Sequence, residues 1–384
     1  MRLSDLVGQT RATTVLRNAI RRGHVAHAYL FRGPAGVGKS TAAQLFAEAL
    51  NCEGPSRATT GEGCGTCRSC QLTAAGSHPD VWTVTFLVER GRRKTEISID
   101  QIRRNPKKRG EAPRPIVQDA ILRPVLGRHK IYLINPAEKM SDEGQNALLK
   151  LLEEPPPYAV LILVTSQPDA LLPTTLSRCQ QVAFQLAGTG AIAAHLETLG
   201  ADPAEAASLA ALSGGRVGWA VSAARQPAVL AVRRNLLDLC ARLPEYSLPQ
   251  SLRLAEEVKE QARTLVEARA EREEEEEEGE TAGGAEPGRD RALRAELPWC
   301  LDVMTLWYRD RLAAGRGGGL VNPDYAEAIR AAAHTAPRPE ESVAFLLAAK
   351  HHLERNANLD LTLEALAIGL LAGGERAGHK PSRR

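Results

Sequence analysis

Apolar and polar positions follow different patterns in the two halves of the chain. Up to about residue 185, apolar runs of strand length alternate with segments whose apolar residues recur at helical spacing. The runs at 28–31, 131–134 and 160–164 are short and wholly apolar, as expected of buried strands. This alternation is typical of an α/β domain with a mostly parallel sheet, which we predict over residues 1–185.

Two helices are expected between these strands. The segment from Ser40 to Leu50 has a helical apolar face made of Ala42, Leu45, Phe46, Ala49 and Leu50. A second helix should run from Asp142 to about Glu154. Asp142 can cap it with Gln145 three residues on, and the prolines at 155–157 end it.

Beyond residue 186 the strand signal fades, and alanine and leucine dominate in segments such as 204–212 and 343–353. We predict a small helical domain over 186–225 and a larger all-helical domain over 226–384. An acidic insertion at about 270–292, with eight Glu against one Arg between 271 and 280, interrupts the larger domain. It has too few apolar groups to offset the entropy of ordering, so we expect a disordered spacer.

Composition and charge narrow the class of protein. A chain of 384 residues with 43% hydrophobic content can form two or three domains. We see no apolar segment of signal-peptide or membrane-spanning length, so we expect a cytoplasmic protein without a membrane partner. The net charge of +3 conceals a basic stretch at 90–114, with ten Lys and Arg against three Asp and Glu. It could contact DNA phosphates, although a solvated loop is the commoner explanation.

Residues 33–40 read Gly-Pro-Ala-Gly-Val-Gly-Lys-Ser and fit the pattern of a phosphate-binding loop between a strand and a helix. Backbone N–H groups and the helix N-terminus attract phosphates, Lys39 supplies a charge, and Ser40 can ligate Mg²⁺. The alternative is a glycine-rich turn with a chance lysine. The predicted nucleotide-binding residues of this segment are Gly33, Gly36, Gly38, Lys39, Ser40 and Thr41.

Hydrolysis of a bound nucleotide needs further groups. P-loop ATPases place an Asp at the end of a later strand to hold Mg²⁺, and many add a Glu that polarises water. After the strand at 131–134 this chain has Asn135 and Pro136 instead. We therefore expect ATP and Mg²⁺ to bind without significant hydrolysis; in the alternative, Glu138 compensates for the missing pair.

Four of the seven cysteines lie close together. Cys52, Cys64, Cys67 and Cys70 have the C-x₁₁-C-x₂-C-x₂-C spacing of four thiolates around tetrahedral zinc. Four sulfur ligands leave no open position, so the Zn²⁺ would be structural. The alternative is free or disulfide-paired cysteines. The isolated cysteines, at 179, 240 and 300, are more typical of small buried apolar residues.

Together these features resemble the bacterial DNA polymerase III clamp-loader ATPase subunits of the AAA+ class, over most of the first 185 residues. The segments that carry the resemblance lie around the phosphate loop and beyond it: 6–9, 27–31, the four-cysteine insertion, 146–156, 176–179 and, more weakly, 353–358. The resemblance implies an AAA+ P-loop domain with a zinc module at 52–70. It also implies that the domain at 186–225 is a helical lid and the domain at 226–384 an oligomerisation collar.

Within this family, gamma/tau subunits carry Asp-Glu where this chain has Asn135-Pro136, so the chain is more similar to the delta prime group. Some delta prime proteins lack a usable phosphate loop, whereas this loop is complete. The resemblance implies a scaffold subunit in a hetero-pentamer with gamma/tau and delta subunits. That complex loads the beta sliding clamp onto primed DNA during DNA replication.

The resemblance also implies roles for single residues. Arg178, in the segment Leu-Ser-Arg-Cys at 176–179, would act as an arginine finger in the ATP site of a neighbouring subunit. Thr165 would be the sensor 1 residue and Arg216 the sensor 2 residue. Arg178 could instead be an ordinary surface arginine. Two other functions stay open: an active gamma/tau-type ATPase, and a zinc-bearing DNA-binding protein with a vestigial loop.

Overall fold

The computed structural model describes residues 1–86, 88–89, 92–93, 96–103, 115–276, 289–333, 338–355 and 357–375. The contacts divide the chain into two compact units. The first comprises Met1–Ala191 with Gly215–Gly218, and the second comprises Ile192–Gly214 with Trp219–Arg384. Most of the basic stretch at 90–114 and residue 356 of the 353–358 segment lie outside the described residues.

A five-stranded sheet forms the centre of the first unit, and all of its pairings are parallel. In spatial order the strands are β2 (Val81–Val84), β5 (Lys130–Ile134), β6 (Ala159–Thr165), β1 (Ala28–Arg32) and β7 (Gln180–Ala183). β1 leads into the phosphate loop and lies between β6 and β7. The predicted α/β class with a parallel sheet is confirmed.

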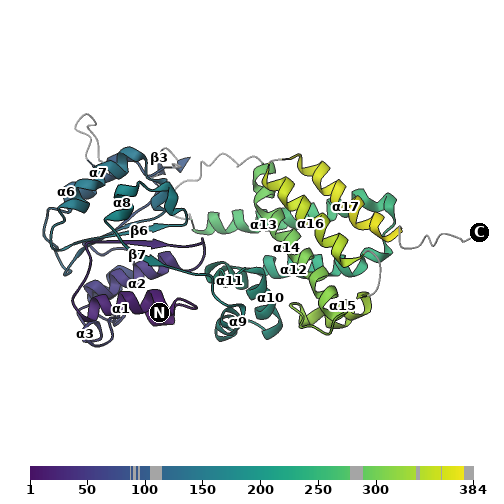
Figure 1. Ribbon diagram of the computed structural model, residues 1–384, viewed down its shortest axis with the longest axis horizontal. Helices are drawn as coiled ribbons and strands as arrows, with labels where there is room; N and C mark the ends of the chain where they lie inside the picture. Colours follow the sequence, from purple (N-terminus) through teal and green to yellow (C-terminus); the bar gives the residue numbers. More distant parts are fainter. Residues whose placement is uncertain are drawn as a thin grey trace, which may run out of the picture. The chain divides into compact units, whose positions relative to one another are not determined.

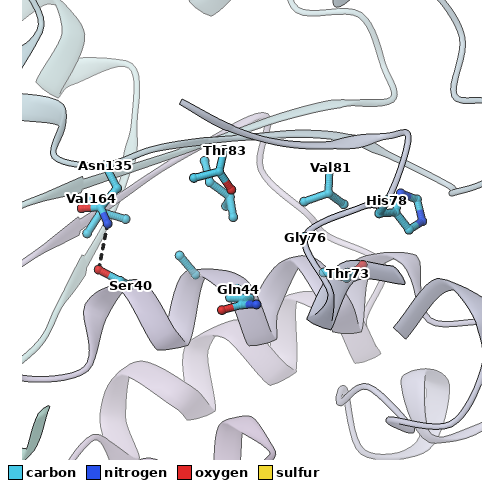
Figure 2. Close-up of a pocket in the computed structure, with 11 residues that line it drawn as sticks. Ser40, Gln44, Thr73, Gly76, His78, Val81, Thr83, Asn135 and Val164 are labelled. Carbon is cyan, nitrogen blue, oxygen red and sulfur yellow. Dashed lines mark hydrogen bonds between the residues drawn. The ribbon is translucent and has the colours of Figure 1, made fainter. Parts of the chain in front are cut away.

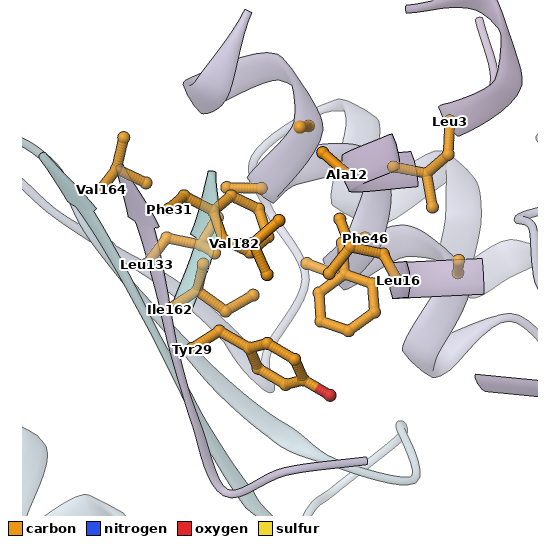
Figure 3. Close-up of a cluster of buried hydrophobic side chains, with 14 of the residues drawn as sticks. Leu3, Ala12, Leu16, Tyr29, Phe31, Phe46, Leu133, Ile162, Val164 and Val182 are labelled. Atoms are coloured by element: carbon orange, nitrogen blue, oxygen red, sulfur yellow. The ribbon is translucent and has the colours of Figure 1, made fainter. Parts of the chain in front are cut away.

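Helices cover both faces of this sheet (Figure 1). α1 (Thr10–Arg21) and α2 (Lys39–Asn51) lie on one face, and α6 (Ile116–Asp119), α7 (Asp142–Glu153) and α8 (Pro173–Ser177) on the other. Because successive strand residues point to opposite faces, β1 contributes to both cores. Tyr29 and Phe31 pack with Phe46 of α2 in the cluster drawn in Figure 3, while Ala28 and Leu30 join the opposite cluster.

The expected helices form with small shifts at their ends. α2 starts one residue before and ends one residue after the expected 40–50. α7 ends at Glu153, and its N-cap is Ser141 rather than Asp142. Ser141 is the cap because its hydroxyl accepts a hydrogen bond from the Gly144 N–H at 3.2 Å, and Asp142 therefore lies in the first turn.

Along the sequence, the shorter elements of the first unit lie mostly between these strands and helices. They are η1 (Leu3–Asp5), α3 (Ser56–Thr59), α4 (Arg68–Ala74), β3 (Val88–Glu89), β4 (Arg92–Arg93), α5 (Ile99–Ile102), η2 (Ala137–Lys139) and η3 (Pro168–Ala170). β3 and β4 pair antiparallel as a separate two-stranded sheet.

The described residues of the second unit form helices and no strands. They are α9 (Thr189–Thr198), α10 (Pro203–Leu212), α11 (Val217–Ala224), α12 (Pro227–Arg242), η4 (Leu243–Glu245), η5 (Leu248–Gln250), α13 (Ser251–Glu276), α14 (Arg289–Ala314), η6 (Pro323–Tyr325), α15 (Ala326–Ala332), α16 (Pro339–Glu354) and α17 (Leu359–Glu375). α9 and α11 each begin in a segment assigned to the first unit.

A buried guanidinium ties the first helices of this unit to the later ones. Arg233 of α12 is 1% exposed and donates to Asp324 of η6 at 2.7 Å and to the Ser208 hydroxyl of α10 at 2.8 Å. The ion pair between Arg233 and Asp324 favours one packing arrangement, because loss of either partner leaves a charge without its counterpart. α10 is thereby packed with the helices that follow it.

The acidic run begins within a helix. α13 continues to Glu276, past the expected start of a disordered insertion at about residue 270, because glutamate is a good helix former. Residues 277–288 lie outside the described residues. Among the residues that the structure describes, no helix is long and apolar enough to cross a membrane.

Candidate nucleotide and metal sites

The phosphate loop at 33–40 connects β1 to the N-terminus of α2 and needs glycine at particular positions. Gly33 has φ +146°, and a Cβ there would lie 2.3 Å from the Phe184 carbonyl oxygen. Gly38, the N-cap of α2, has the left-handed φ of +96°. Side chains at these positions would strain or displace the loop. The glycine pattern therefore reflects the backbone path of the loop between β1 and α2.

Lys39, the first residue of α2, is buried within this loop. Its ammonium donates to the carbonyl oxygens of Gly33 at 2.7 Å and Pro34 at 2.6 Å. Burial lowers the pKa of Lys39, and the nearby Glu138 carboxylate partly counters this effect. The ammonium thus lies inside the loop, held by neutral carbonyls that phosphate oxygens could replace.

Gln9 supports the loop from the start of α1, a role that motif reading did not assign. It is 3% exposed, and its amide nitrogen donates to the carbonyl oxygens of Val37 and Gln185 at 3.3 and 2.7 Å. Its amide oxygen accepts from the Gln185 N–H at 3.1 Å. The segment at 6–9 carried the family resemblance, but only the fold shows what its glutamine contacts.

Both residues with a proposed sensor role, Thr165 and Arg216, lie near the loop. Thr165 ends β6, is 1% exposed, and pairs in register with Arg32, which precedes Gly33. Arg216 belongs to the short segment 215–218, which is part of the first unit, and a Cβ built on Gly36 would lie 3.3 Å from the Arg216 Cβ. The Gly218 N–H also donates to the Gly36 carbonyl at 2.8 Å. Thr41 is exposed in the first turn of α2.

Asn135 and Ser40 meet at one edge of a cavity of about 220 Å³ (Figure 2). The Asn135 amide nitrogen donates to the Ser40 hydroxyl at 3.0 Å. The cavity extends between α2 and the sheet, and its polar lining comes from Ser40, Gln44, Thr73, His78, Thr83 and Asn135. None of these side chains is acidic. Mg²⁺ prefers carboxylates and phosphate oxygens, so the protein groups described at this position fit Mg²⁺ poorly.

Glu138 lies in η2 beyond the cavity and is engaged elsewhere. One carboxylate oxygen accepts from the Ser166 hydroxyl at 2.7 Å and the Ser166 N–H at 3.2 Å. Burial is the largest single influence and would raise the pKa of Glu138, but hydrogen bonds from Ser166, from the Thr165 side chain and from the backbone together outweigh it, and the pKa is lowered. The other oxygen is buried with no hydrogen-bond partner among the described residues. The carboxylate is therefore ionised and only half satisfied.

The four cysteines gather beyond the other end of α2. Their sulfur atoms all lie within 4.8 Å of one another, and two of the four residues are buried. Backbone N–H groups donate to three of the sulfurs: Gly54 and Cys64 to Cys52 at 3.3 Å, Cys67 to Cys64 at 3.3 Å, and Cys70 to Cys67 at 3.4 Å.

Hydrogen bonds to its sulfur, the largest effect coming from the Thr66 backbone, lower the pKa of Cys64 to about 6, whereas burial raises the pKa values of Cys52 and Cys70. N–H donors of this kind favour the thiolate form that binds metal. The cluster could hold a metal ion such as zinc.

Arg178 follows α8 and contacts its own chain. One terminal nitrogen donates to the Glu153 carboxylate of α7 at 2.7 Å, and the other donates to the Thr174 carbonyl at 3.0 Å. Glu153 falls within the 146–156 segment, but sequence reasoning gave it no role. The only sign of such a role in the sequence was that Glu153 is an acidic residue at the end of a predicted helix that precedes the proposed arginine finger.

Comparison with known proteins finds relatives of the first half of the chain. Residues 8–187 match the family model described as "DNA polymerase III, delta subunit". Over 196 residues, 50% of this chain and 54% of the relative, it is 42% identical to DNA polymerase III subunit delta' of Pseudomonas aeruginosa. It is 36% identical to subunit tau/gamma of Haemophilus influenzae, over 50% of this chain and 25% of that protein.

Among solved structures, a Thermotoga maritima gamma subunit-related protein is 19% identical, with 94% of this chain and 98% of that chain covered, at a TM-score of 0.36. We draw no conclusion about fold or function from a structural likeness at that level. The chain spans about half or less of the length of the curated relatives it matches.

The parallel sheet and the loop at 33–40 between β1 and α2 have the arrangement of a P-loop domain. Residues 8–187, just under half of the chain, are similar to DNA polymerase III clamp-loader delta prime and gamma/tau subunits. The resemblance seen in the sequence is thereby confirmed.

Proposed function

We propose that this chain is a delta prime-type subunit of a bacterial clamp loader that holds a nucleotide without significant hydrolysis. The observation that carries the proposal is the contact between the Ser40 hydroxyl and the Asn135 amide. The phosphate loop is complete, whereas the position that should direct a carboxylate at the metal presents an amide N–H. An amide carries no negative charge and cannot act as a base, so the site favours binding over turnover.

Within the assembly we assign the chain a scaffold role. It occupies one position in a hetero-pentamer with gamma/tau and delta subunits, and the assembly opens the beta sliding clamp for loading onto primed DNA. Support comes from the delta' and tau/gamma proteins that this chain resembles over its first half. The Cys₄ cluster supports structural Zn²⁺ in this chain, since four sulfur ligands leave no position for a substrate.

Arg178 is proposed to act in trans on the ATP of a neighbouring gamma-type subunit. Its side chain is 34% exposed, and a guanidinium can form two parallel hydrogen bonds to phosphate oxygens. We expect Arg178→Ala to lower ATP hydrolysis by the reconstituted loader by roughly 10³-fold, the scale of arginine fingers elsewhere. Nucleotide binding by this chain alone should not change. An unaffected loader rate would contradict the trans role.

The purified full chain tests the proposed function directly. Nucleotide affinity should be measurable by titration with a fluorescent ADP analogue. ATP turnover should stay below about one event per hour, with or without primed DNA and clamp. Turnover of several events per minute from this chain alone would overturn the proposal, and failure to bind nucleotide would remove the role of the loop.

One observation favours an active ATPase as the second candidate. Glu138 is ionised, and one buried oxygen lacks a hydrogen-bond partner among the described residues, so it could bind a water near the loop. The variant Glu138→Gln separates the candidates. It abolishes turnover if Glu138 replaces the missing base, and leaves the expected very low rate unchanged if the chain is a nucleotide holder.

A further inference from the structure

The guanidinium of Arg178 is held in place before any partner arrives. Its side chain is about one-third exposed, and its two terminal nitrogens donate to separate acceptors, the Glu153 carboxylate and the Thr174 carbonyl. Glu153 is the last residue of α7, and its side chain is 52% exposed. Arg178 is the C-cap of α8, directly after its last residue. The ion pair therefore joins the ends of two helices.

These contacts use only part of the guanidinium. Arginine has five N–H groups in a planar fork, and the two contacts occupy one N–H on each terminal nitrogen. Among the contacts of the described residues, the Nε–H and the second N–H of each terminal nitrogen are left for another acceptor. A phosphate can accept two parallel bonds from such a fork. The pair thus fixes the plane of the guanidinium while leaving donors for a phosphate oxygen.

The position of Glu153 is itself set by α7. Near the start of this helix, Gln145 is 1% exposed, and its side-chain oxygen accepts from the Leu172 N–H at 2.8 Å. Leu172 is the N-cap of α8. α7 and α8 are therefore joined at both ends, by Gln145 with Leu172 and by Glu153 with Arg178. The carboxylate extends from a helix whose placement relative to α8 is fixed.

We infer that Glu153 is a positioning residue for Arg178, which rests on the proposed trans role of that arginine. A long, exposed arginine samples many rotamers, and ordering it costs entropy at the moment of catalysis. The Glu153 oxygen holds the side chain in one arrangement beforehand, so the neighbour's phosphate meets a preorganised donor. The exposed pair is weak enough for the guanidinium to shift toward the stronger charge of a phosphate.

The opposite effect of Glu153 would be inhibition. A carboxylate reduces the positive potential of the guanidinium and competes with phosphate for its N–H groups. The two effects differ in what they require. Positioning needs a hydrogen-bond acceptor at the Glu153 side chain, whereas competition needs its negative charge. Glutamine retains the acceptor and removes the charge, and alanine removes both.

The test measures ATP hydrolysis by a clamp loader reconstituted from gamma/tau, delta and this full chain carrying Glu153→Ala or Glu153→Gln. Glu154→Ala is the matched control, because it removes an exposed carboxylate one residue away that has no side-chain partner among the described contacts. Arg178→Ala is tested in parallel. Nucleotide affinity and the thermal midpoint of the isolated chain are recorded for each variant.

We expect Glu153→Ala to lower kcat about three- to fivefold, the scale of one exposed ion pair, with KM for ATP unchanged. Glu153→Gln should retain at least half of the wild-type kcat, and Glu154→Ala should retain all of it. A Glu153→Ala rate at or above the wild-type value overturns the positioning role, as does an equal loss in both Glu153 variants. No loss with Arg178→Ala would instead overturn the trans role itself.

Discussion

The two ends of α2 present two sites built in different ways. At its C-terminal end, Cys52 and the three other cysteines come from one stretch of 52–70, and their hydrogen bonds come from the same stretch. At its N-terminal end, the phosphate loop contacts residues that are distant in sequence. Gln9, Asn135 and Arg216 come from three other segments of the fold.

This difference determines how each site responds when one of its residues is replaced. A local cluster depends on its ligands and on short backbone turns, so one lost ligand removes the site. The phosphate loop forms its concavity alone, while its chemistry depends on which side chain the neighbouring strand delivers beside Ser40. In the function that we propose, Asn135 makes the N-terminal site a nucleotide holder without altering the loop. The predictions below test this contrast in order of expected effect.

The largest effect is expected at the cysteine cluster. Cys67→Ser should abolish binding of one Zn²⁺ equivalent, because three ligands remain and serine is a poor zinc ligand. Structural zinc contributes roughly 10 kcal/mol of apparent folding energy in small domains, and each kcal/mol shifts the midpoint of a domain of this size by about 2–4 °C, so we expect a fall in thermal midpoint of at least about 20 °C. Metal analysis and thermal unfolding measure both effects.

Chelation provides the control for the cysteine variant. A chelator should lower the midpoint of the wild-type chain, and added Zn²⁺ should restore it, whereas Cys67→Ser should respond to neither. A carefully purified wild-type chain without zinc would contradict the metal assignment.

The second-largest effect is expected at Lys39. Lys39→Met keeps an unbranched side chain in the buried position but removes the charge that would bind the phosphates. Charged hydrogen bonds contribute about 1.5–3 kcal/mol, so nucleotide affinity should fall roughly 10- to 100-fold. The thermal midpoint should change by less than about 3 °C. Titration with a fluorescent ADP analogue measures the affinity, and unchanged binding would show that the loop does not hold phosphate.

A smaller effect is expected from Asn135→Asp. In the wild-type chain, nucleotide affinity in EDTA and in Mg²⁺ should agree within about threefold, because no carboxylate orients the cation. The variant should bind ATP about tenfold more tightly with Mg²⁺ than without it, since aspartate supplies the missing charge. The control Asn146→Asp adds the same charge at an exposed site on α7. Strong Mg²⁺ dependence in the wild type would contradict the poor fit of its donors.

The smallest effect is expected at Gln9, which supports the loop without facing the nucleotide. Gln9→Ala removes the side-chain bonds to Val37 and Gln185 and leaves their carbonyl groups to find other partners. We expect an affinity loss of about threefold and a midpoint lower by about 2–4 °C. An affinity loss as large as that of Lys39→Met would indicate that Gln9 contacts the nucleotide directly.

Much of the fold followed from the hydrophobic pattern because buried parallel strands are continuous apolar runs. The strands at 28–31, 131–134 and 160–164 were found in this way, whereas β7 was missed because Gln180 and Gln181 make this edge strand polar. The cap of α7 was misplaced by one residue because Ser141 and Asp142 both suit that role, and only backbone geometry separates them.

The sequence alone determined which groups are available: a loop that can surround phosphate, four thiols at zinc spacing, and an amide where an acid would be needed. Each follows from covalent spacing within a short segment. Tertiary structure decided which groups meet. Asn135 contacts Ser40, Glu138 turns to Ser166, and Glu153 holds Arg178, because parallel strands and paired helices bring their ends together across tens of residues. No local pattern records such contacts, since they depend on the packing of the whole domain.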